Sequence, residues 1–372
     1  MKQRTLLLAA VWLLVGGAWV TARDADGENG TIATAVKNAG GTVNVDFAKP
    51  DKPVVAVWLN GPKVQKFDVT QLKELPKLRR LAVGGPVWTD KEMEQVATLT
   101  NLEELDVAGA EITDAGLEPL KALTKLQSLR LPSKITDDGL KHLKPFTELR
   151  HLTLSLGCGD DGLKHLKPLA KLETLYLFGG KFTDAGLANL KGMPEFKKLT
   201  CFGTNVNGSG LDSLKDCPKL DTLELTSSPA TGKGLANLKE LKALTTLNLW
   251  ASPFNDEDTQ YLKDLKKLKT LNLWSTKITD KGLENLKGLE SLQDLSLMQT
   301  EVTDKGLESL KGLEKLNRLT LHGTKVTDEC VGSLKEMKGL TSVDLQYTKV
   351  TKDGLKALAK ARPNLSIFQI PK

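Results

Sequence analysis

The stretch TLNLWSTKITDKGLENLKGLESLQDL, residues 270–295, contains one complete unit of a repeating pattern. Leu271 to Leu273 alternates apolar and polar residues, which is typical of a short β-strand. The part that follows predicts a helix, because Thr279 is a suitable N-cap and Asp280 favours the positive N-terminus of a helix. An inward apolar stripe is formed by Leu283, Leu286 and Leu289. The predicted unit is therefore one strand followed by one helix.

This unit recurs along the chain. The last apolar residue of the motif L-x-x-L-x-L falls at Leu59, Val83, Val107, Leu131, Leu154, Leu177, Cys201, Leu225, Leu249, Leu273, Leu297, Leu321, Leu345 and Ile370. The steps are 24 residues, except two of 23 and a final one of 25. A fixed period of this length predicts a solenoid, in which each unit buries its apolar face against its neighbours. Glycine also recurs near the predicted helix starts, which predicts that adjacent coils pack too closely there for a side chain.

These motifs resemble the leucine-rich repeat superfamily over residues 54–370. ITDAGLEPLKAL (112–123) and LKDCPKLDTLEL (214–225) are similar to its cysteine-containing type, and the whole chain is most similar to exported bacterial members. The resemblance implies an α/β horseshoe-shaped solenoid with a parallel sheet on the concave face and helices on the convex face. It also implies a non-enzymatic scaffold whose commonest ligands are proteins. Where relatives have Asn after the strand, this chain has Thr or Ser, whose hydroxyl can bond the backbone of the turn.

The two ends of the chain differ from the repeats. Residues 1–22 combine a basic start, an apolar run and small residues at the end, which predicts a cleaved secretory signal. An uncleaved membrane anchor is the alternative, although the run is shorter than the ~20 residues that span a bilayer. Residues 23–53 are predicted to be a disordered start followed by a cap of one helix and one strand, and residues 54–372 a repeat domain with 14 strands. The expected location is outside the cytoplasm: periplasmic, cell-surface or secreted.

Composition argues against several classes of function. The 52 Lys and Arg against 46 Asp and Glu give a formal charge of +6, a mild imbalance that does not indicate a nucleic-acid partner. None of the four histidines has metal-ligand spacing with another ligand type, and no catalytic or phosphate-binding motif is present, so we predict no metal, no cofactor and no catalysis. The four cysteines occupy inward or crowded phases of the repeat, where free Cys acts as a small hydrophobe. A Cys201–Cys217 disulfide stays open, because an exported chain permits it.

The outward positions of the strands supply the candidate site. Side chains alternate across a strand, so the residues beside the inward leucines face the concave side. Trp250 and Trp274 occupy equivalent positions on adjacent strands, where neighbouring strands lie about 4.8 Å apart. The predicted ligand-binding residues are Tyr176, Phe178, Phe202, Trp250, Trp274 and Met298, with Glu224, Asn248, Asn272 and Asp294 as polar contacts around them.

Several interpretations of this column stay open. An exposed apolar patch indicates a surface that binds a protein partner. Aromatic rings flanked by Asn also suit a polysaccharide or cell-wall glycan. Stacked aromatics can instead serve only the sheet, because cross-strand pairs contribute ~0.2–1 kcal/mol each, and the repeated LNLW can be a product of duplication. Substrate recognition like that of ubiquitin-ligase adaptors, and a purely structural array, are further alternatives.

Overall fold

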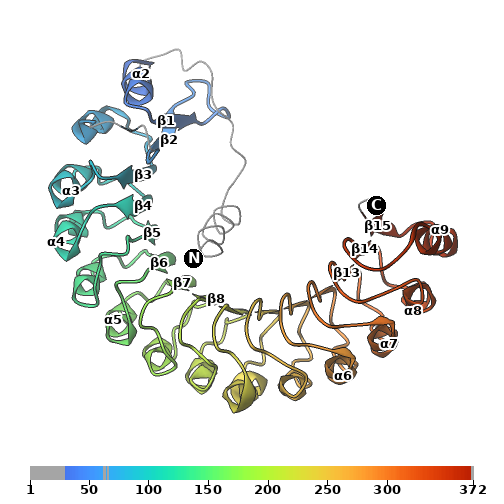
Figure 1. Ribbon diagram of the computed structural model, residues 1–372. Helices are drawn as coiled ribbons and strands as arrows, with labels where there is room; N and C mark the ends of the chain where they lie inside the picture. The colour runs from blue at the N-terminus through green and yellow to red at the C-terminus, as the bar shows by residue number, and fades with distance from the viewer. Residues whose placement is uncertain (1–29, 62–63, 65–66, 370–372) are drawn as a thin grey trace.

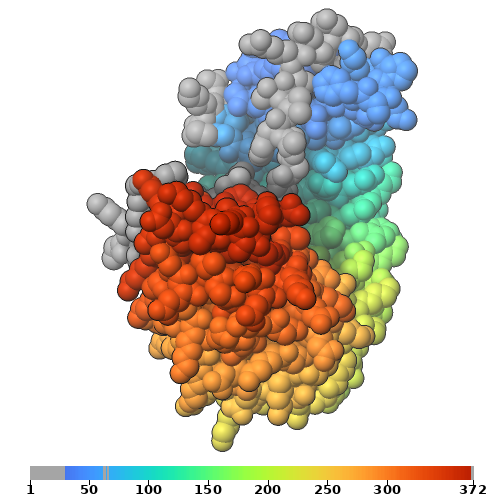
Figure 2. All heavy atoms as spheres, turned by 90° about the vertical axis from the view of Figure 1, so that its right-hand side faces the viewer, coloured from blue at the N-terminus to red at the C-terminus, as the bar shows by residue number. Residues whose placement is uncertain are grey.

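The computed structural model describes residues 30–61, 64 and 67–369, and it shows an open, curved stack of coils (Figure 1). The strands line the inner, concave side of the arc, and the helices line the outer, convex side. This arrangement confirms the predicted α/β solenoid and its two faces. Each coil follows the previous one along the arc, from the N-terminal coils in blue to the C-terminal coils in red (Figure 2). The predicted signal (1–22) and the predicted disordered start (23–29) lie outside the described residues.

One sheet of 15 strands runs through the described part of the chain, and its strands are paired in sequence order. Helix α2 (Gly30–Asn38) and strand β1 (Thr42–Val45) come first, and β1 pairs antiparallel with β2 (Val54–Leu59). The pairings from β2 onward are parallel. The later strands are β3 (Arg80–Gly85), β4 (Glu104–Ala110), β5 (Ser128–Arg130), β6 (His151–Leu154), β7 (Thr174–Phe178), β8 (Lys198–Phe202), β9 (Thr222–Thr226), β10 (Thr246–Asn248), β11 (Thr270–Asn272), β12 (Asp294–Ser296), β13 (Arg318–Thr320), β14 (Ser342–Asp344) and β15 (Ser366–Phe368).

The convex side consists of short helices. Its α-helices are α3 (Asp90–Val96), α4 (Asp114–Leu117), α5 (Asp160–Leu163), α6 (Asp280–Leu283), α7 (Asp304–Leu307), α8 (Cys330–Glu336) and α9 (Lys352–Ala361). Its 3₁₀ turns are η1 (Val69–Glu74), η2 (Pro119–Ala122), η3 (Asp138–Leu143), η4 (Lys164–Leu166), η5 (Gly186–Leu190), η6 (Leu211–Leu214), η7 (Gly232–Glu240), η8 (Asp258–Tyr261), η9 (Glu284–Leu286) and η10 (Glu308–Leu310). The helix predicted from residues 276–289 is thus one α-helical turn followed by a 3₁₀ turn, because a coil of this length also has to hold a strand and two turns. No helix among the described residues has the length and apolar character needed to cross a bilayer.

The core is a single ladder of leucines between the sheet and the helices. Leu271, Leu273 and Leu283 are fully buried, as the repeat predicts. The two 23-residue steps keep the sheet register, since Leu129 pairs with Leu152 and Leu152 pairs with Leu175. All four cysteines are buried and unbridged, so the Cys201–Cys217 disulfide that the sequence left open is not formed.

The last predicted step of 25 residues, ending at Ile370, is wrong. Val343 pairs with Ile367 and Asp344 pairs with Phe368, so the register keeps 24 residues into β15. The Ser366 N–H donates to the Thr341 carbonyl at 2.9 Å, and this ladder bond holds the strand in register. The extra residue is absorbed in the turn before Leu365, because backbone pairing and not the leucine spacing sets the register.

A contact between successive coils explains the recurring T-D-x-G motif. Thr279 caps its own helix, as predicted, by accepting the Lys281 N–H. Asp280 reaches the next coil: its carboxylate accepts the Thr303 N–H at 2.8 Å and the Thr303 hydroxyl at 2.6 Å. A Cβ on Gly306 would lie 2.4 Å from the same carboxylate oxygen. The predicted crowding at glycine is therefore confirmed, and its cause is an aspartate in the preceding coil.

The Thr and Ser residues that replace the usual Asn also bond the backbone, as predicted. Thr276 and Thr300 each donate their hydroxyl to the carbonyl three residues earlier, at 2.6 Å. Both side chains are buried. The hydroxyls therefore satisfy the turn in which each strand ends, directly below the concave surface.

Candidate functional site

Five aromatic rings form an unbroken row on the concave face, from β7 to the end of β11. The aromatic row consists of Tyr176, Phe178, Phe202, Trp250 and Trp274. Successive ring centroids lie 6.4, 5.9, 6.2 and 4.5 Å apart. The contact between the third and fourth rings passes over β9, whose own residue in this column, Thr226, is buried. The structure thus brings together the aromatic residues that the sequence singled out, and Met298 continues their column one coil further.

The rings of the row cover one another. Trp250 and Trp274 stack with 10° between their planes, and so do Tyr176 and Phe178. All five side chains are half-buried rather than fully exposed. Aromatic contacts of this kind contribute ~0.5–1.5 kcal/mol each beyond area burial. The row is therefore a rigid, pre-packed ridge whose ring faces point along the arc and whose ring edges are open to a ligand.

Asn248 and Asn272 hold the two tryptophans from below. The Asn248 Oδ1 accepts the Trp250 N–H at 3.0 Å, and the Asn272 Oδ1 accepts the Trp274 N–H at 2.9 Å. The indole Nε1–H of Trp274 donates to the Gln299 Oε1 at 3.0 Å. The two Asn carbonyl oxygens thus fix the local backbone instead of pointing at a ligand. Gln299 was missed in the sequence, because it lies outside the alternating pattern of the strand.

The two acidic candidates are paired within the molecule. Glu224 accepts hydrogen bonds from the Lys198 Nζ at 2.7 Å and from the Thr200 hydroxyl at 3.0 Å. The Lys198 ammonium also lies 5.5 Å from the centre of the Tyr176 ring. Asp294 lies 3.8 Å from Arg318, and its burial raises its pKa while Arg318 lowers it. Charge on this part of the concave face is therefore largely neutralised beside the row.

A left-handed residue follows the aromatic column in successive coils. The positions with φ between 51° and 68° are Gly179, Gly203, Ser227, Ala251, Ser275, Gln299, Gly323 and Tyr347. Their N–H groups extend the sheet ladder: Ser227 donates to the Trp250 carbonyl at 2.8 Å, and Ala251 donates to the Trp274 carbonyl at 2.9 Å. The backbone of each tryptophan is thus held from the neighbouring coil. The signal in the sequence was the run of small residues at this phase, which we did not interpret.

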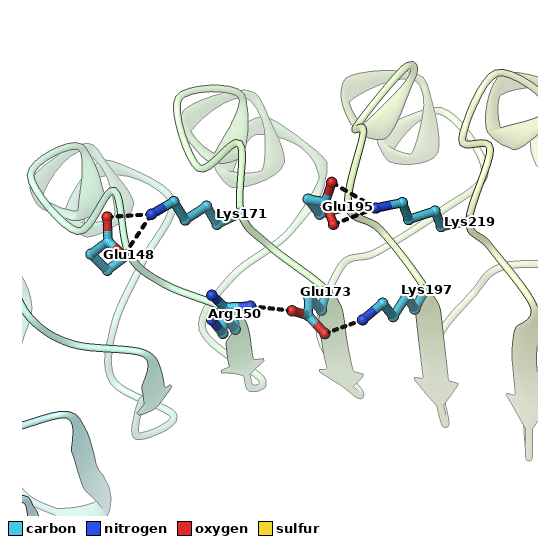
Figure 3. A network of polar contacts seen from close by, with 7 residues as sticks. All are labelled: Glu148, Arg150, Lys171, Glu173, Glu195, Lys197 and Lys219. Atoms are coloured by element: carbon cyan, nitrogen blue, oxygen red, sulfur yellow. Dashed lines mark hydrogen bonds and ion pairs between the residues drawn. The ribbon is translucent and has the colours of Figure 1, made fainter.

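Ion pairs join the coils just before strands β6 to β9 (Figure 3). Glu173 accepts from Arg150 at 2.5 Å and from Lys197 at 2.6 Å. Parallel pairs join Glu148 to Lys171 and Glu195 to Lys219, each at 2.6 Å. The hydrogen bond from Lys197 is the main reason that the pKa of Glu173 is lowered. This network stabilises the coils that carry the first half of the row.

Neither the thiols nor the histidines form a reactive centre here. Burial raises the pKa of Cys158, Cys201 and Cys330 to about 12. The His322 ring lies 4.8 Å from the Tyr347 ring, on the concave side near the C-terminal end. In residues 30–61, 64 and 67–369, no three His, Cys, Asp or Glu side chains come together as a metal site.

Comparison with known proteins agrees with this geometry. A family model described as Leucine Rich repeat matches residues 98–121, 264–287, 288–311 and 340–359. The chain is a leucine-rich repeat protein. This superfamily was the one predicted from the repeat. A search of curated protein sequences returned no match.

Solved structures of leucine-rich repeat proteins share the fold. An internalin from Listeria monocytogenes is 21% identical with a TM-score of 0.55, over 84% of this chain and 94% of that one. A leucine-rich repeat protein from Leptospira interrogans is 19% identical with a TM-score of 0.54, over 90% and 98%. The mouse RP105/MD-1 complex gives 15% identity and a TM-score of 0.60, over 85% of this chain and 59% of that one. At these identities the likeness concerns the fold alone.

Proposed function

We propose that this leucine-rich repeat protein is a non-enzymatic scaffold that holds a protein partner on its concave face. The observation that carries the proposal is the aromatic row, a ridge of five half-buried rings on the inner side of the arc. Large, rigid side chains at the centre of an interface carry most of its binding energy. Their geometry is already fixed here by stacking and by the Asn248 and Asn272 hydrogen bonds. A partner would thus bind without first ordering these side chains, which lowers the entropic cost.

The orientation of the rings favours a protein over a glycan. A sugar stacks on the open face of an aromatic ring, whereas the faces of Trp250 and Trp274 cover each other at 4.5 Å. Open ring edges and the half-buried Met298 suit the apolar side chains of a protein, since aromatic residues and Met are enriched at protein interfaces. The sequence pattern of residues 1–22 further supports a partner outside the cytoplasm.

The decisive variants are Trp250→Ala and Trp274→Ala. Each is expected to weaken binding of a protein partner by about 2 kcal/mol or more, as truncation of a hot-spot residue does. Envelope proteins from the source organism and soluble cell-wall glycans would be titrated while tryptophan emission is followed, because a ligand laid on the row changes the surroundings of both indoles.

The matched controls are Lys263→Ala and Lys287→Ala on the helical side, which are expected to leave affinity unchanged. A protein ligand that binds the Trp250→Ala/Trp274→Ala double variant as tightly as the parent would refute the aromatic contact. A ligand found only among the glycans would refute the choice of a protein partner.

A further inference from the structure

Lysines flank the aromatic row on the edge where the strands end. Three residues after the outward column of a coil, the chain has Lys181, Lys277 or Lys349, and all three side chains are exposed. Their backbones are fixed, because the Lys277 N–H donates to the Phe254 carbonyl at 2.8 Å and the Lys349 N–H donates to the Val326 carbonyl at 3.0 Å. We call these three residues the edge lysines. They hold positive charge at set positions along the arc, parallel to the row.

The edge lysines differ from the other charges around the row. On the sheet itself, Lys198 is paired with Glu224, and Arg318 lies near Asp294. On the edge, Lys325 is paired with Glu301. None of the edge lysines makes a side-chain ion pair or hydrogen bond within the described part of the chain. The charge left for a partner on this edge is therefore positive.

Exposed apolar side chains mark both ends of the same edge. Leu156 is 64% exposed and Tyr347 is 67% exposed, each one position after the outward column of its coil. Between them the aromatic row supplies an apolar wall. The coils of β6 and β14 are eight steps apart in the sheet, or about 38 Å at the usual strand spacing. An extended chain of about 12 residues covers that distance.

We propose that the partner contributes an extended, acidic segment with apolar side chains, which lies along this edge between the aromatic row and the edge lysines. Its apolar side chains contact the ring edges, Leu156 and Tyr347, and its carboxylates meet the edge lysines. Charge complementarity of this kind sets orientation and partner choice more than raw affinity. The inference rests on the proposed function, and it adds the chemistry and the conformation of the partner.

The test uses the mature chain and a displayed library of random peptides about 16 residues long, enough to span the edge. We expect the selected peptides to be rich in Asp, Glu and apolar residues, with binding that weakens as sodium chloride is added. The triple variant Lys181→Glu/Lys277→Glu/Lys349→Glu is expected to weaken their binding about tenfold or more. The matched control, Lys239→Glu/Lys263→Glu/Lys287→Glu, has the same net charge with the reversals on the helical side, and it is expected to bind as the parent does.

The outcomes separate this inference from the proposed function. Peptides that lose affinity for both the edge triple variant and the Trp250→Ala/Trp274→Ala variant support both. Peptides that lose affinity only for the tryptophan variant overturn the acidic-segment inference and leave the proposed function in place. Loss only for the edge variant refutes the aromatic contact. Selection of basic peptides, or of none, overturns the inference.

Discussion

The residue that most constrains this fold is an aspartate whose effect lies in the next coil. Asp280 holds the N–H and hydroxyl of Thr303 in the next coil, and it occupies the space where a side chain on Gly306 would stand. The sequence shows that glycine recurs, and from this we predicted crowding. It does not show what causes the crowding, because the two residues are 26 positions apart and meet only once the coils are stacked. A periodic glycine thus reveals a close contact without identifying its partner.

Gly306→Ala should destabilise the protein although alanine is the better helix former. Alanine usually gains ~1 kcal/mol over glycine in a helix. Here its Cβ would displace Asp280 and release the Thr303 cap, and overpacking of this kind costs ~1–3 kcal/mol. We expect a lower midpoint of urea unfolding for Gly306→Ala. Gly312→Ala is the control, since a Cβ there meets nothing within 4 Å, and a comparable loss for it would contradict the explanation.

The thiols give a second prediction at this scale. All four cysteines are buried and free, and burial raises the pKa of three of them to about 12. Only the thiolate reacts readily with disulfide reagents, so the native protein at pH 8 should react very slowly at each. In denaturant, four thiols per chain should react at once. Two reactive thiols in denaturant without reductant would instead indicate a disulfide, such as Cys201–Cys217.

At the scale of the element, a strand here owes its position to one inward side chain in each coil. β11 has only three residues, and its fully buried Leu271 pairs with Leu247 and Leu295 on either side. These strands were predictable because alternation and a 24-residue period agree. The helices were predicted too long, since periodicity does not report how few residues a coil leaves for them. The register of β15 was wrong because ladder bonds, not leucine spacing, decide it.

Leu271→Ala and Trp274→Ala should separate the two faces of β11. Truncating the buried leucine is expected to cost ~2–5 kcal/mol, because it leaves a cavity in the core. Truncating the half-buried tryptophan removes cross-strand pairing only and should cost about 1 kcal/mol or less. Urea unfolding followed by circular dichroism measures both. Equal losses would show that the row is chiefly a packing device of the sheet and would weaken the proposed binding role.

At the scale of the whole molecule, the position of the aromatic column was predictable and the shape of its surface was not. A period that repeats faithfully places Trp250 beside Trp274 in any solenoid of this kind. The stacking of the rings, the hydrogen bonds from Asn248 and Asn272, and the left-handed turns depend on how adjacent coils meet. The edge lysines gain meaning only beside that row, since lysine is common over the whole chain.

The aspartate contacts between coils are interrupted in the middle of the arc. Asp184 is the last of the N-terminal series, and the series resumes at Asp256. Glycines, Gly208 and Gly232, stand at the two intervening aspartate positions. Asp258 stands where other coils have glycine, and it bonds backward to the Thr231 hydroxyl and the Gly232 N–H, each at 2.6 Å. Because neighbouring coils supply much of the stability of a solenoid, this reversed contact is the one most open to disruption.

Asp258→Ala should therefore uncouple the two halves of the arc. The variant leaves the Gly232 N–H and the Thr231 hydroxyl without their partner, which costs ~1–3 kcal/mol for buried groups. Native-state hydrogen exchange, read by mass spectrometry, should show faster exchange in β9, β10 and the turns η7 and η8, with β12 and β13 unchanged. Asp212→Ala is the control, because that carboxylate bonds only the exposed Lys215. Uniformly faster exchange along the chain in Asp258→Ala would mean that the solenoid opens as one unit and that the interruption has no mechanical role.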